Sequence, residues 1–388
     1  MRQGYRIIDA DRHVVEPIGM WREYLAPELR EHAPYPVAPA GGASFGERIS
    51  RLGARALLPV PPMPTLDGRP LYRKMSDRAW FELAWAARQR AEHLERIERP
   101  EGHLEDMDRE GIDVAVLYPT YALLIMGFDA LSPELGSGFA AAYNAWLGDF
   151  CARDPARLRG VALISPHAPA QMVPELSRAV ARGFQAVVLR PNLVGGRRLS
   201  HPLYEEFWAA CERLAIGVVL HEGTHAYLPA AGADRFDTRF AMHACSHPME
   251  QMMALLDLVE GGVLERHPGL RVAFMEAGCG WLPYWLWRLD EEYAHLAGEV
   301  AENVRAEPSA YFRRQCAVAA EPGEPLLPQV VELFGEESVL FGTDFPHLDH
   351  DEGIVAQALS LSLGGRLPES ALRKMLWDNA ARFFRVTG

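Results

Sequence analysis

The sequence is poor in lysine and has no long hydrophobic run, and each scarcity excludes a class of protein. Only Lys74 and Lys374 are lysines, so nearly all of the 39 basic residues are arginine. The 52 acidic residues give a formal net charge of −13. This charge argues against nucleic acid or an anionic membrane as the main partner, because both attract a basic surface. No stretch approaches the roughly 20 apolar residues of a membrane span, and the N-terminal segment lacks the apolar core of a signal peptide. A small or carrier-linked substrate is therefore the expected partner.

Cysteine is also scarce, and its spacing excludes two kinds of small scaffold. The five cysteines are scattered and odd in number, and no two are spaced as CxxC. This pattern is typical of reduced core thiols and not of a disulfide framework or a zinc ribbon. We therefore expect a cytoplasmic protein.

Short, nearly continuous apolar runs alternate with amphipathic segments along most of the chain. Such runs are typical of strands covered on both faces, as in parallel sheets. Eight of them are expected strands: YRIIDA (5–10), DVAVLYP (113–119), GVALISP (160–166), AVVLRP (186–191), GVVLH (217–221), RVAFME (271–276), QCAV (315–318) and SVLFGTD (338–344). Eight parallel β/α units close into a barrel, so the sequence predicts an α/β protein with a (β/α)8 TIM-type barrel and a C-terminal helix near residues 368–384. A doubly wound sheet is the alternative, but no Gly-rich phosphate-binding motif follows the first run.

Two insertions interrupt this alternation within what we predict to be a single domain, residues 1–388. Residues 17–100, rich in proline and aromatic side chains, separate the first two strands, and residues 222–246 follow the fifth. Both insertions come after the carboxyl ends of strands, where such barrels keep their active sites. We therefore predict that they form lids, with Trp80 and Trp85 over the mouth of the barrel. Surface decoration is the alternative.

Residues of metal-binding types stand at the carboxyl ends of four predicted strands. Asp11 and His13 end the first strand, and their spacing by two aims both side chains at one face. His221 ends the fifth strand, Glu276 the sixth and Asp344 the eighth. These ends meet at one rim of a barrel, where a metal ion supplies the positive charge that buried carboxylates require. The sequence therefore predicts a divalent-metal site. Caps or loop anchors are the alternative for each residue taken alone.

The segment HEGTH (221–225) matches the HExxH motif of zinc proteases. That motif works because a helix places its two histidines one turn apart. A strand-like run precedes the segment and Gly223 lies inside it, so we predict neither a helix nor a metalloprotease. His225 remains a candidate extra ligand.

Four other histidines are further candidates. His243 and His247 are expected to begin the helix before the sixth strand, with His247 directed toward the metal site or, equally, into packing. His347, in GTDFPHLDH, is expected to contact a metal ligand or the substrate, and so to orient it, without binding the metal itself. His167, after the third strand, is a weaker candidate of the same kind.

Several longer segments resemble those of a known family: IDADRHVVEP, YNAWLGDFCARDPARLRGVALI, LHEG, GGVLERHPGLRVAFMEAGCGWLPYWLWRLDE, LFGTDFPHLD and DNAARFF. They are similar to the amidohydrolase-related family that includes aminocarboxymuconate semialdehyde decarboxylase, over most of residues 5–385. The resemblance implies that Asp11, His13, His221 and Asp344 bind the metal.

The chain departs from the pattern of these relatives in three places. The decarboxylases usually begin with HxH, whereas this chain has Asp11 in the first position, and their histidine base at the end of strand 6 is here Glu276. Many two-metal hydrolases of the wider superfamily bridge their ions with a carboxylated lysine on strand 4. Strand 4 here ends in Arg190, and neither lysine lies in a predicted strand, so a lysine-carbamate hydrolase is excluded.

Carboxylates in place of imidazoles favour iron or manganese over zinc and permit a second cation. Glu276 then acts as a bridging or second-metal ligand, with His225 or His247 completing the shell. This pattern is similar to that of the family's non-haem dinuclear iron or iron–manganese oxygenases, such as the hydroxylases of aminoisobutyrate and of the platensimycin pathway.

Three functions follow from these considerations. The favoured prediction is an O2-dependent monooxygenase with two Fe ions, or Fe and Mn, that hydroxylates a small or carrier-linked carboxylic acid. The alternative is a mononuclear Zn or Mn decarboxylase or C–C/C–N hydrolase, in which Glu276 or Asp344, assisted by His347, moves protons. The third is a catalytically inactive partner subunit. In each case we expect a homo-oligomer.

Overall fold

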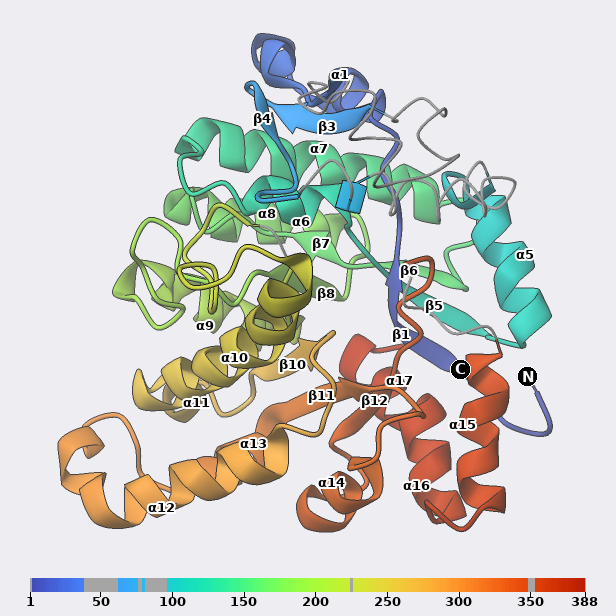
Figure 1. Cartoon of the computed structure of the whole chain (residues 1–388), viewed down its shortest axis with the longest axis vertical. Coiled ribbons are helices and arrows are strands. Elements are labelled where there is room, and N and C mark those ends of the chain that lie inside the picture. Colours follow the sequence, from blue (N-terminus) through green and yellow to red (C-terminus); the bar gives the residue numbers. More distant parts are fainter. Residues whose placement is uncertain are drawn as a thin grey trace, which may run out of the picture.

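The computed structural model describes residues 2–37, 62–75, 79–80, 96–223, 226–347 and 353–387, and a ring of parallel strands lies at its centre (Figure 1). The strands follow one another around the ring in chain order: β1 (Ile8–His13), β5 (Val114–Tyr118), β6 (Leu158–Gly160), β7 (Ala162–Leu163), β8 (Ala186–Leu189), β9 (Gly217–His221), β10 (Arg271–Met275), β11 (Cys316–Ala320) and β12 (Val339–Phe341). β6 and β7 are two halves of one position, because only Val161 separates them. The eight positions coincide with the eight predicted runs, which confirms the (β/α)8 barrel.

Hydrogen bonds between β1 and the residues that follow β12 close the ring. The amide of His13 donates to the carbonyl of Phe345 at 2.7 Å. Deeper in the barrel, the carboxylate of Asp9 accepts the amide of Thr343 at 3.0 Å and its hydroxyl at 2.6 Å. The register of β1 shifts between Asp9 and Arg12. The closed ring excludes the alternative of an open, doubly wound sheet.

Helices surround the ring of strands (Figure 1). The main covering helices are α5 (Pro100–Glu110), α7 (Pro133–Cys151), α8 (Pro169–Ala181), α9 (Glu205–Leu214), α10 (Arg239–Glu260), α12 (Leu282–Val300), α13 (Pro308–Gln315), α14 (Leu327–Phe334) and α15 (Ile354–Leu363). Shorter elements are α1 (Met20–Tyr24), α6 (Tyr121–Met126), α11 (Val263–Arg266), and 3-10 turns at Pro27–His32 and Pro202–Tyr204. The predicted C-terminal helix is α16 (Glu369–Arg373), a π-helical turn at Lys374–Asp378 and α17 (Asn379–Phe384). Because helices cover the strands from outside, the strand residues are almost all buried.

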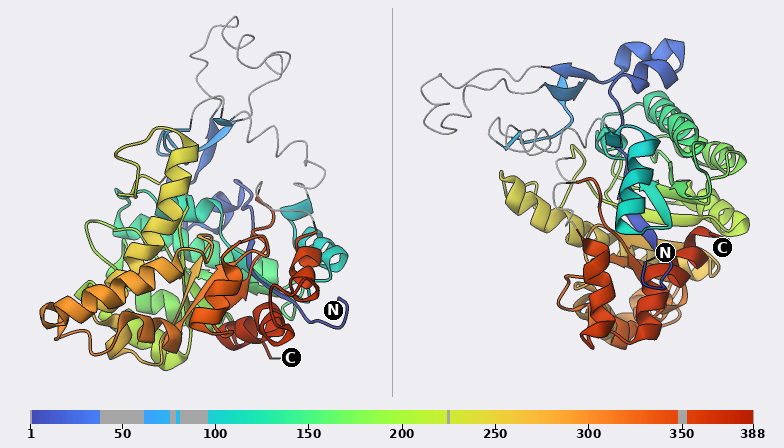
Figure 2. Two further views of the ribbon diagram at one scale, coloured as in Figure 1. Left: turned by 60° about the horizontal axis from the view of Figure 1, so that its bottom comes forward. Right: turned by 90° about the vertical axis from the view of Figure 1, so that its right-hand side faces the viewer.

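The insertion after β1 contains a small antiparallel sheet, β2 (Tyr35–Val37), β3 (Met63–Leu66) and β4 (Arg69–Pro70). Figure 2 shows it standing away from the barrel on the side where α10 begins. The hydroxyl of Tyr227 donates to the carbonyl of Pro70 at 3.0 Å, and Lys74 Nζ donates to the carbonyl of Ala233 at 2.9 Å. The described part of the insertion therefore contacts the loop that follows β9.

The predicted lid falls only partly within the described residues. Trp80 is buried and its ring lies 5.5 Å from that of Tyr72, whereas Trp85 lies outside the described residues. The contacts with the loop after β9 place the described part of the insertion beside the carboxyl end of that strand. Closure over the mouth of the barrel stays a prediction.

The second insertion differs from the expectation, because helix α10 begins at Arg239 and takes in the end of the expected loop. The hydroxyl of Thr238 caps the helix by accepting the amide of Ala241 at 3.3 Å. His243 and His247 were expected to begin this helix, but they lie in its second and third turns.

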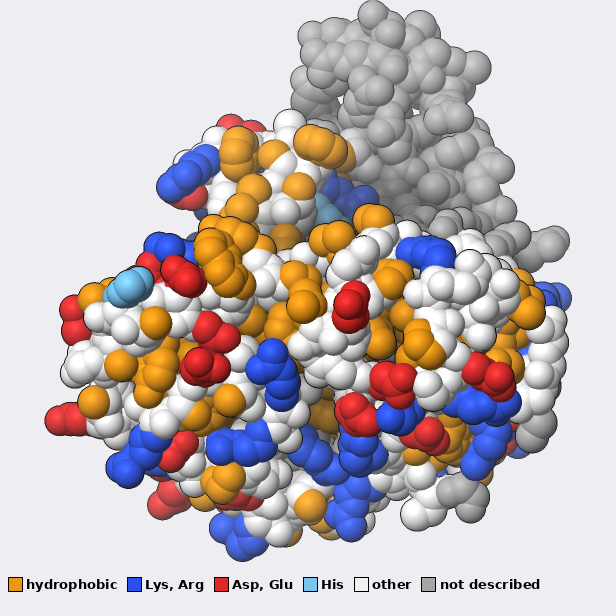
Figure 3. All heavy atoms as spheres, turned by 90° about the horizontal axis from the view of Figure 1, so that it is seen from below, with side chains coloured by type: hydrophobic (Ala, Val, Ile, Leu, Met, Phe, Trp, Pro, Cys, Tyr) orange, Lys and Arg blue, Asp and Glu red, His pale blue; other side chains and the backbone are white. Residues whose placement is uncertain are grey.

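The structure bears on three expectations from the composition: the state of the cysteines, the presence of membrane-spanning helices and the charge of the surface. The five cysteines are all free, as their spacing predicted. No helix in the described part of the chain is long and apolar enough to cross a membrane. Figure 3 shows both acidic and basic side chains on the face seen from below.

A buried arginine joins β1 to helix α5 and gives a stability prediction. Arg12 is fully buried and donates to Asp106 at 2.6 Å, to Asp9 at 3.4 Å and to His103 Nδ1 at 3.3 Å. Replacing Arg12 by methionine leaves these buried carboxylates without their cation, so we expect the free energy of unfolding to fall by about 3–5 kcal/mol. Urea unfolding of metal-free protein measures this loss.

The matched control is Arg109, which pairs with the same Asp106 but is 56% exposed. For Arg109→Met we expect a loss of about 0–1 kcal/mol, because solvent screens an exposed ion pair. Equal losses in the two variants would contradict the importance of burial for the Arg12 interaction.

Candidate metal centre

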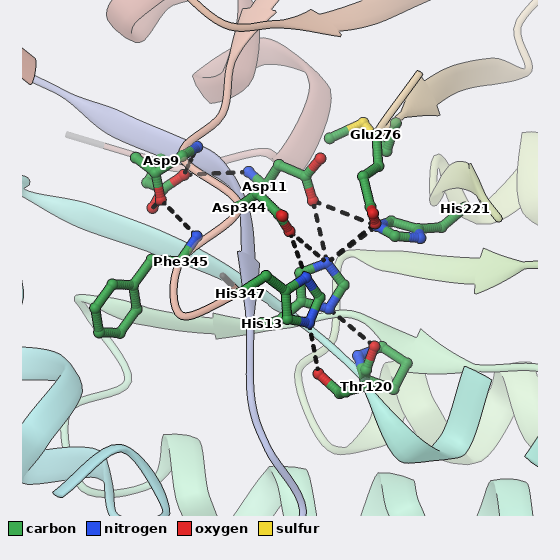
Figure 4. Close-up of polar contacts among 12 residues, drawn as sticks. Asp9, Asp11, His13, Thr120, His221, Glu276, Asp344, Phe345 and His347 are labelled. Atoms are coloured by element: carbon green, nitrogen blue, oxygen red, sulfur yellow. Dashed lines mark hydrogen bonds and ion pairs between the residues drawn. The ribbon is translucent and has the colours of Figure 1, made fainter. Parts of the chain in front are cut away.

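Five of the predicted metal ligands meet at the carboxyl end of the barrel (Figure 4). Asp11 and His13 lie on β1, His221 ends β9, Glu276 follows β10, and Asp344 comes shortly after β12. Parallel strands bring their carboxyl ends to one rim, which explains why residues more than 300 positions apart in the chain can meet there. Figure 4 shows these side chains directed toward one another.

The backbone fixes the orientation of the two imidazoles. His13 Nδ1 lies 2.9 Å from the carbonyl oxygen of Pro119, and His221 Nδ1 lies 2.8 Å from that of Glu222. A carbonyl oxygen only accepts, so each Nδ1 carries a proton, and in the corresponding neutral tautomer the lone pair of the ring is at Nε2. The two Nε2 atoms are only 3.0 Å apart. Two lone pairs at this distance repel each other unless a cation lies between or beside them.

Three carboxylates complete this cluster. Asp11 Oδ1 is buried without a hydrogen bond, 3.7 Å from His13 Nε2 and 3.6 Å from His221 Nε2. Glu276 Oε2 lies 3.1 Å from His221 Nε2, and Asp344 Oδ1 lies 3.5 Å from His13 Nε2. Carboxylates gathered this closely and largely withdrawn from water need a counter-charge. Carboxylate and imidazole donors suit a divalent cation such as Mn2+, Fe2+ or Zn2+, so the residues present fit a metal ion.

Two of these acids have a backbone conformation that L-residues rarely adopt. Glu276 has φ +49° and Asp344 has φ +52°. A left-handed conformation at a residue other than glycine carries a cost of order 1 kcal/mol and persists only where the surroundings enforce it. Its occurrence after two strands of the barrel, β10 and β12, is typical of a functional site.

A hydrogen-bonded chain connects the cluster with the mouth of the barrel. His347 Nδ1 lies 2.7 Å from Asp344 Oδ1, and His347 Nε2 lies 3.1 Å from the hydroxyl of Thr120, the N-cap residue of α6. The His347 side chain is 25% exposed, against 8% for Asp344. His347 therefore lies between a nearly buried carboxylate and the solvent, which is suitable for moving a proton.

A second buried network supports the cluster from the side of α10. Glu222 forms an ion pair with Arg190 at 2.8 Å, and its other oxygen lies 3.4 Å from His247 Nε2. His247 Nδ1 donates to the carbonyl of Glu276 at 2.8 Å, so the histidine holds the backbone that carries this ligand. His243, His247 and Glu276 also offer a second set of close donor atoms. Burial lowers the pKa of His247 to about 4, so its ring is neutral near pH 7.

The HEGTH segment is not helical where the structure describes it. Glu222 and Gly223 have no regular structure after β9, and Thr224 and His225 lie outside the described residues. The exclusion of a zinc-protease motif is therefore correct for the described part, and the role of His225 stays a prediction.

His167 lies away from the cluster. Its Nε2 donates to the carbonyl of Phe128 at 2.9 Å, and its Nδ1 lies 3.4 Å from the hydroxyl of Ser165. Burial lowers its pKa to about 4. These contacts make His167 a loop anchor and do not bring it to the predicted ligands.

The lowered pKa of His167 predicts a dependence of stability on pH. The unfolded chain takes up this proton near pH 6.5 and the folded chain only near pH 4, so the unfolded state binds more protons between these values. Stability should therefore fall as the pH falls through this window, by up to about 1.4 kcal/mol per pH unit from this group. Urea unfolding at pH 7, 6 and 5 should show a smaller acid loss in His167→Gln than in the parent. Parallel profiles would contradict the prediction.

Comparisons with known proteins identify a matching family model and several related enzymes. A family model described as "Amidohydrolase" matches residues 8–386. The chain is 24% identical to 2-amino-3-carboxymuconate-6-semialdehyde decarboxylase of Dictyostelium discoideum, over 64% of this chain and 66% of that enzyme. It is 28% identical to γ-resorcylate decarboxylase of Rhodococcus jostii, over 57% of this chain and 72% of that enzyme.

A solved structure shows the same fold with a metal. The chain superposes on dihydroxybenzoic acid decarboxylase from Polaromonas sp., a structure with bound manganese and 2-nitroresorcinol, with a TM-score of 0.67 and 18% identity. The match covers 98% of this chain and 97% of that one.

These findings contradict the predicted O2-dependent monooxygenase. The relatives named above are decarboxylases, and the metal in the solved structure is manganese. The prediction of two iron ions likewise has no support from them. The error has a physical cause: carboxylate and imidazole donors determine which cations bind, but the same donors serve both oxygenation and decarboxylation.

Proposed function

Since the chain belongs to the amidohydrolase family, whose model matches residues 8–386, we propose that it is a divalent-metal-dependent decarboxylase. The proposed substrate is a small carboxylic acid whose carboxylate stands on an unsaturated or aromatic carbon, as in the substrates that the names of its relatives give. A decarboxylase is one of the functions that the sequence offers as the alternative to a monooxygenase.

The observation that carries the proposal is the arrangement of unsatisfied donors at the carboxyl end of the barrel. The Nε2 atoms of His13 and His221 face each other at 3.0 Å, and Asp11 Oδ1 beside them is buried without a hydrogen bond. We assign Asp11, His13, His221 and Glu276 as ligands of one divalent ion, manganese or zinc. When bound, such an ion supplies Lewis-acid polarisation of a coordinated substrate oxygen.

The remaining chemistry is a proton transfer by the chain itself. In decarboxylation the bond between the carboxylate carbon and its neighbour breaks, the electron pair stays on the neighbour, and that carbon takes a proton as CO2 leaves. We assign Asp344 as the group that delivers this proton. His347, bonded to Asp344 at 2.7 Å and partly exposed, returns a proton from solvent, and Thr120 holds its other nitrogen.

The test is a product assay on the manganese-loaded protein in D2O with a panel of hydroxybenzoates. We expect release of CO2, one deuterium per turnover on the carbon that carried the carboxylate, and loss of both after treatment with a chelator. Hydrolysis of esters or amides in place of CO2 release would overturn the proposal. So would CO2 release that persists in the chelated protein.

A further inference from the structure

We propose that the amino-terminal end of the barrel holds a second binding site, for a small molecule with a carboxylate or phosphate group on an apolar body. The site is a cavity of about 320 Å3. Its wall includes Leu158 and Ala186, the first residues of β6 and β8, and Cys151, the last residue of α7. The metal ligands lie at the opposite, carboxyl ends of the strands, so the two sites are separate.

The charged residues of the cavity wall are both arginines. Arg159 and Arg182 line the cavity, and no aspartate or glutamate does. In the described part of the chain neither guanidinium has a hydrogen bond or an ion pair, and Arg159 Nε is buried without a partner. Arg182 extends over a turn of α7, since a Cβ atom added at Gly148 would lie 3.7 Å from its Nη1. Two unpaired cations thus share one cavity of a protein with a net charge of −13.

This arrangement requires an acceptor. A buried N–H group without a partner costs about 1–3 kcal/mol, and such groups are rare in native structures. The Nε and Nη atoms of an arginine form a planar fork that matches two oxygens of a carboxylate or a phosphate. Burial raises the pKa of the neighbouring Cys151 thiol to about 12, so this side chain is uncharged near pH 7 and does not supply the anion. An anion from solution satisfies Arg159 Nε and balances both charges.

The rest of the wall indicates what the anion is attached to. The apolar part of the lining includes Val116, Leu158, Phe184, Ala186 and Phe384. Ligand cavities of roughly 300 Å3 and more hold small organic molecules, so an inorganic ion alone leaves most of this space unused. A compact aromatic or branched acid, or the corresponding phosphate ester, fits both the cation pair and the apolar wall.

The experiment is isothermal titration of the metal-loaded protein at fixed ionic strength, with benzoate and inorganic phosphate as the probes. We expect Kd for benzoate to rise at least tenfold in Arg159→Gln and in Arg182→Gln. The control is Arg213→Gln, which removes the same charge from an exposed arginine of α9 outside the cavity, and its Kd should equal that of the parent. Arg182 is exposed, so its variant should fold even if the Arg159 variant does not.

The remaining outcomes of the titration either support or overturn the second site. Phosphate binding with the same dependence on the two arginines, without benzoate binding, supports the site and identifies a phosphate group as its ligand. Benzoate binding that survives both arginine variants but is lost in His221→Ala takes place at the metal centre and overturns the second site. Equal affinities in all variants, or no binding of either probe, also overturns it.

Discussion

His221→Ala is expected to carry almost no divalent metal and to release no measurable CO2 from any hydroxybenzoate that the parent protein accepts. His221 supplies the Nε2 atom closest to two other proposed donors, 3.0 Å from His13 Nε2 and 3.1 Å from Glu276 Oε2. Loss of a group that merely orients a ligand weakens metal binding by about 10–100-fold, and loss of a ligand itself should exceed this. Elemental analysis after manganese loading and gel filtration, together with the CO2 assay, measures both effects.

The control for this experiment is His201→Ala. His201 lies before the 3-10 turn at Pro202–Tyr204, where its ring accepts the amide of Leu203 at 3.2 Å, and it makes no contact with the metal centre. This variant should keep the metal content and activity of the parent, which excludes a general effect of removing a histidine. Full metal occupancy in His221→Ala would refute the ligand assignment.

The barrel could be predicted because its strands are buried on both sides and are therefore almost continuously apolar. The run GVVLH, for example, is β9 over the same five residues, and all five are buried. The beginning of α10 could not be predicted in this way. Phe240, in its first turn, is 86% exposed, so the apolar period that identifies the rest of the helix is absent there. The cap formed by Thr238 fixes the boundary instead.

The predicted ligands could be placed because strand ends share one rim, but their supporting residues depend on tertiary contacts. The contacts of Thr120 and Glu222 could not be predicted from the sequence, because their partners His347 and His247 are 227 and 25 residues away in the chain. Asp9 alternates with Asp11 as a third ligand would, yet it accepts hydrogen bonds from Thr343. The register of β1 shifts between Asp9 and Arg12, so Asp9 and Asp11 lie in different environments. The alternation of residues in the sequence does not show where such a bulge occurs.

Asp344→Asn is expected to retain its metal but to slow decarboxylation by about 10²–10⁴-fold, the range typical of lost acid–base catalysis. Asparagine keeps the size of aspartate, and its oxygen can still accept the proton of His347 Nδ1, so the loop after β12 should keep its conformation. It cannot carry an acidic proton to the substrate. The four proposed ligands Asp11, His13, His221 and Glu276 remain, so the metal-to-protein ratio should not change.

Metal content and rate together decide what Asp344 does, because its Oδ1 lies close to both His347 and a proposed ligand, 2.7 Å from His347 Nδ1 and 3.5 Å from His13 Nε2. Unchanged metal with slow turnover supports the assignment as proton donor. If metal is lost together with activity, Asp344 is instead a metal ligand. If the rate is unchanged, a group other than Asp344 delivers the proton. Asp257→Asn is the control: Asp257 accepts the hydroxyl of Ser200 at 2.5 Å, away from the centre, and its variant should match the parent in both measurements. A carboxylate that lies between a proposed metal site and a partly exposed histidine is suited to protonating a carbon, because the histidine can restore its proton from solvent.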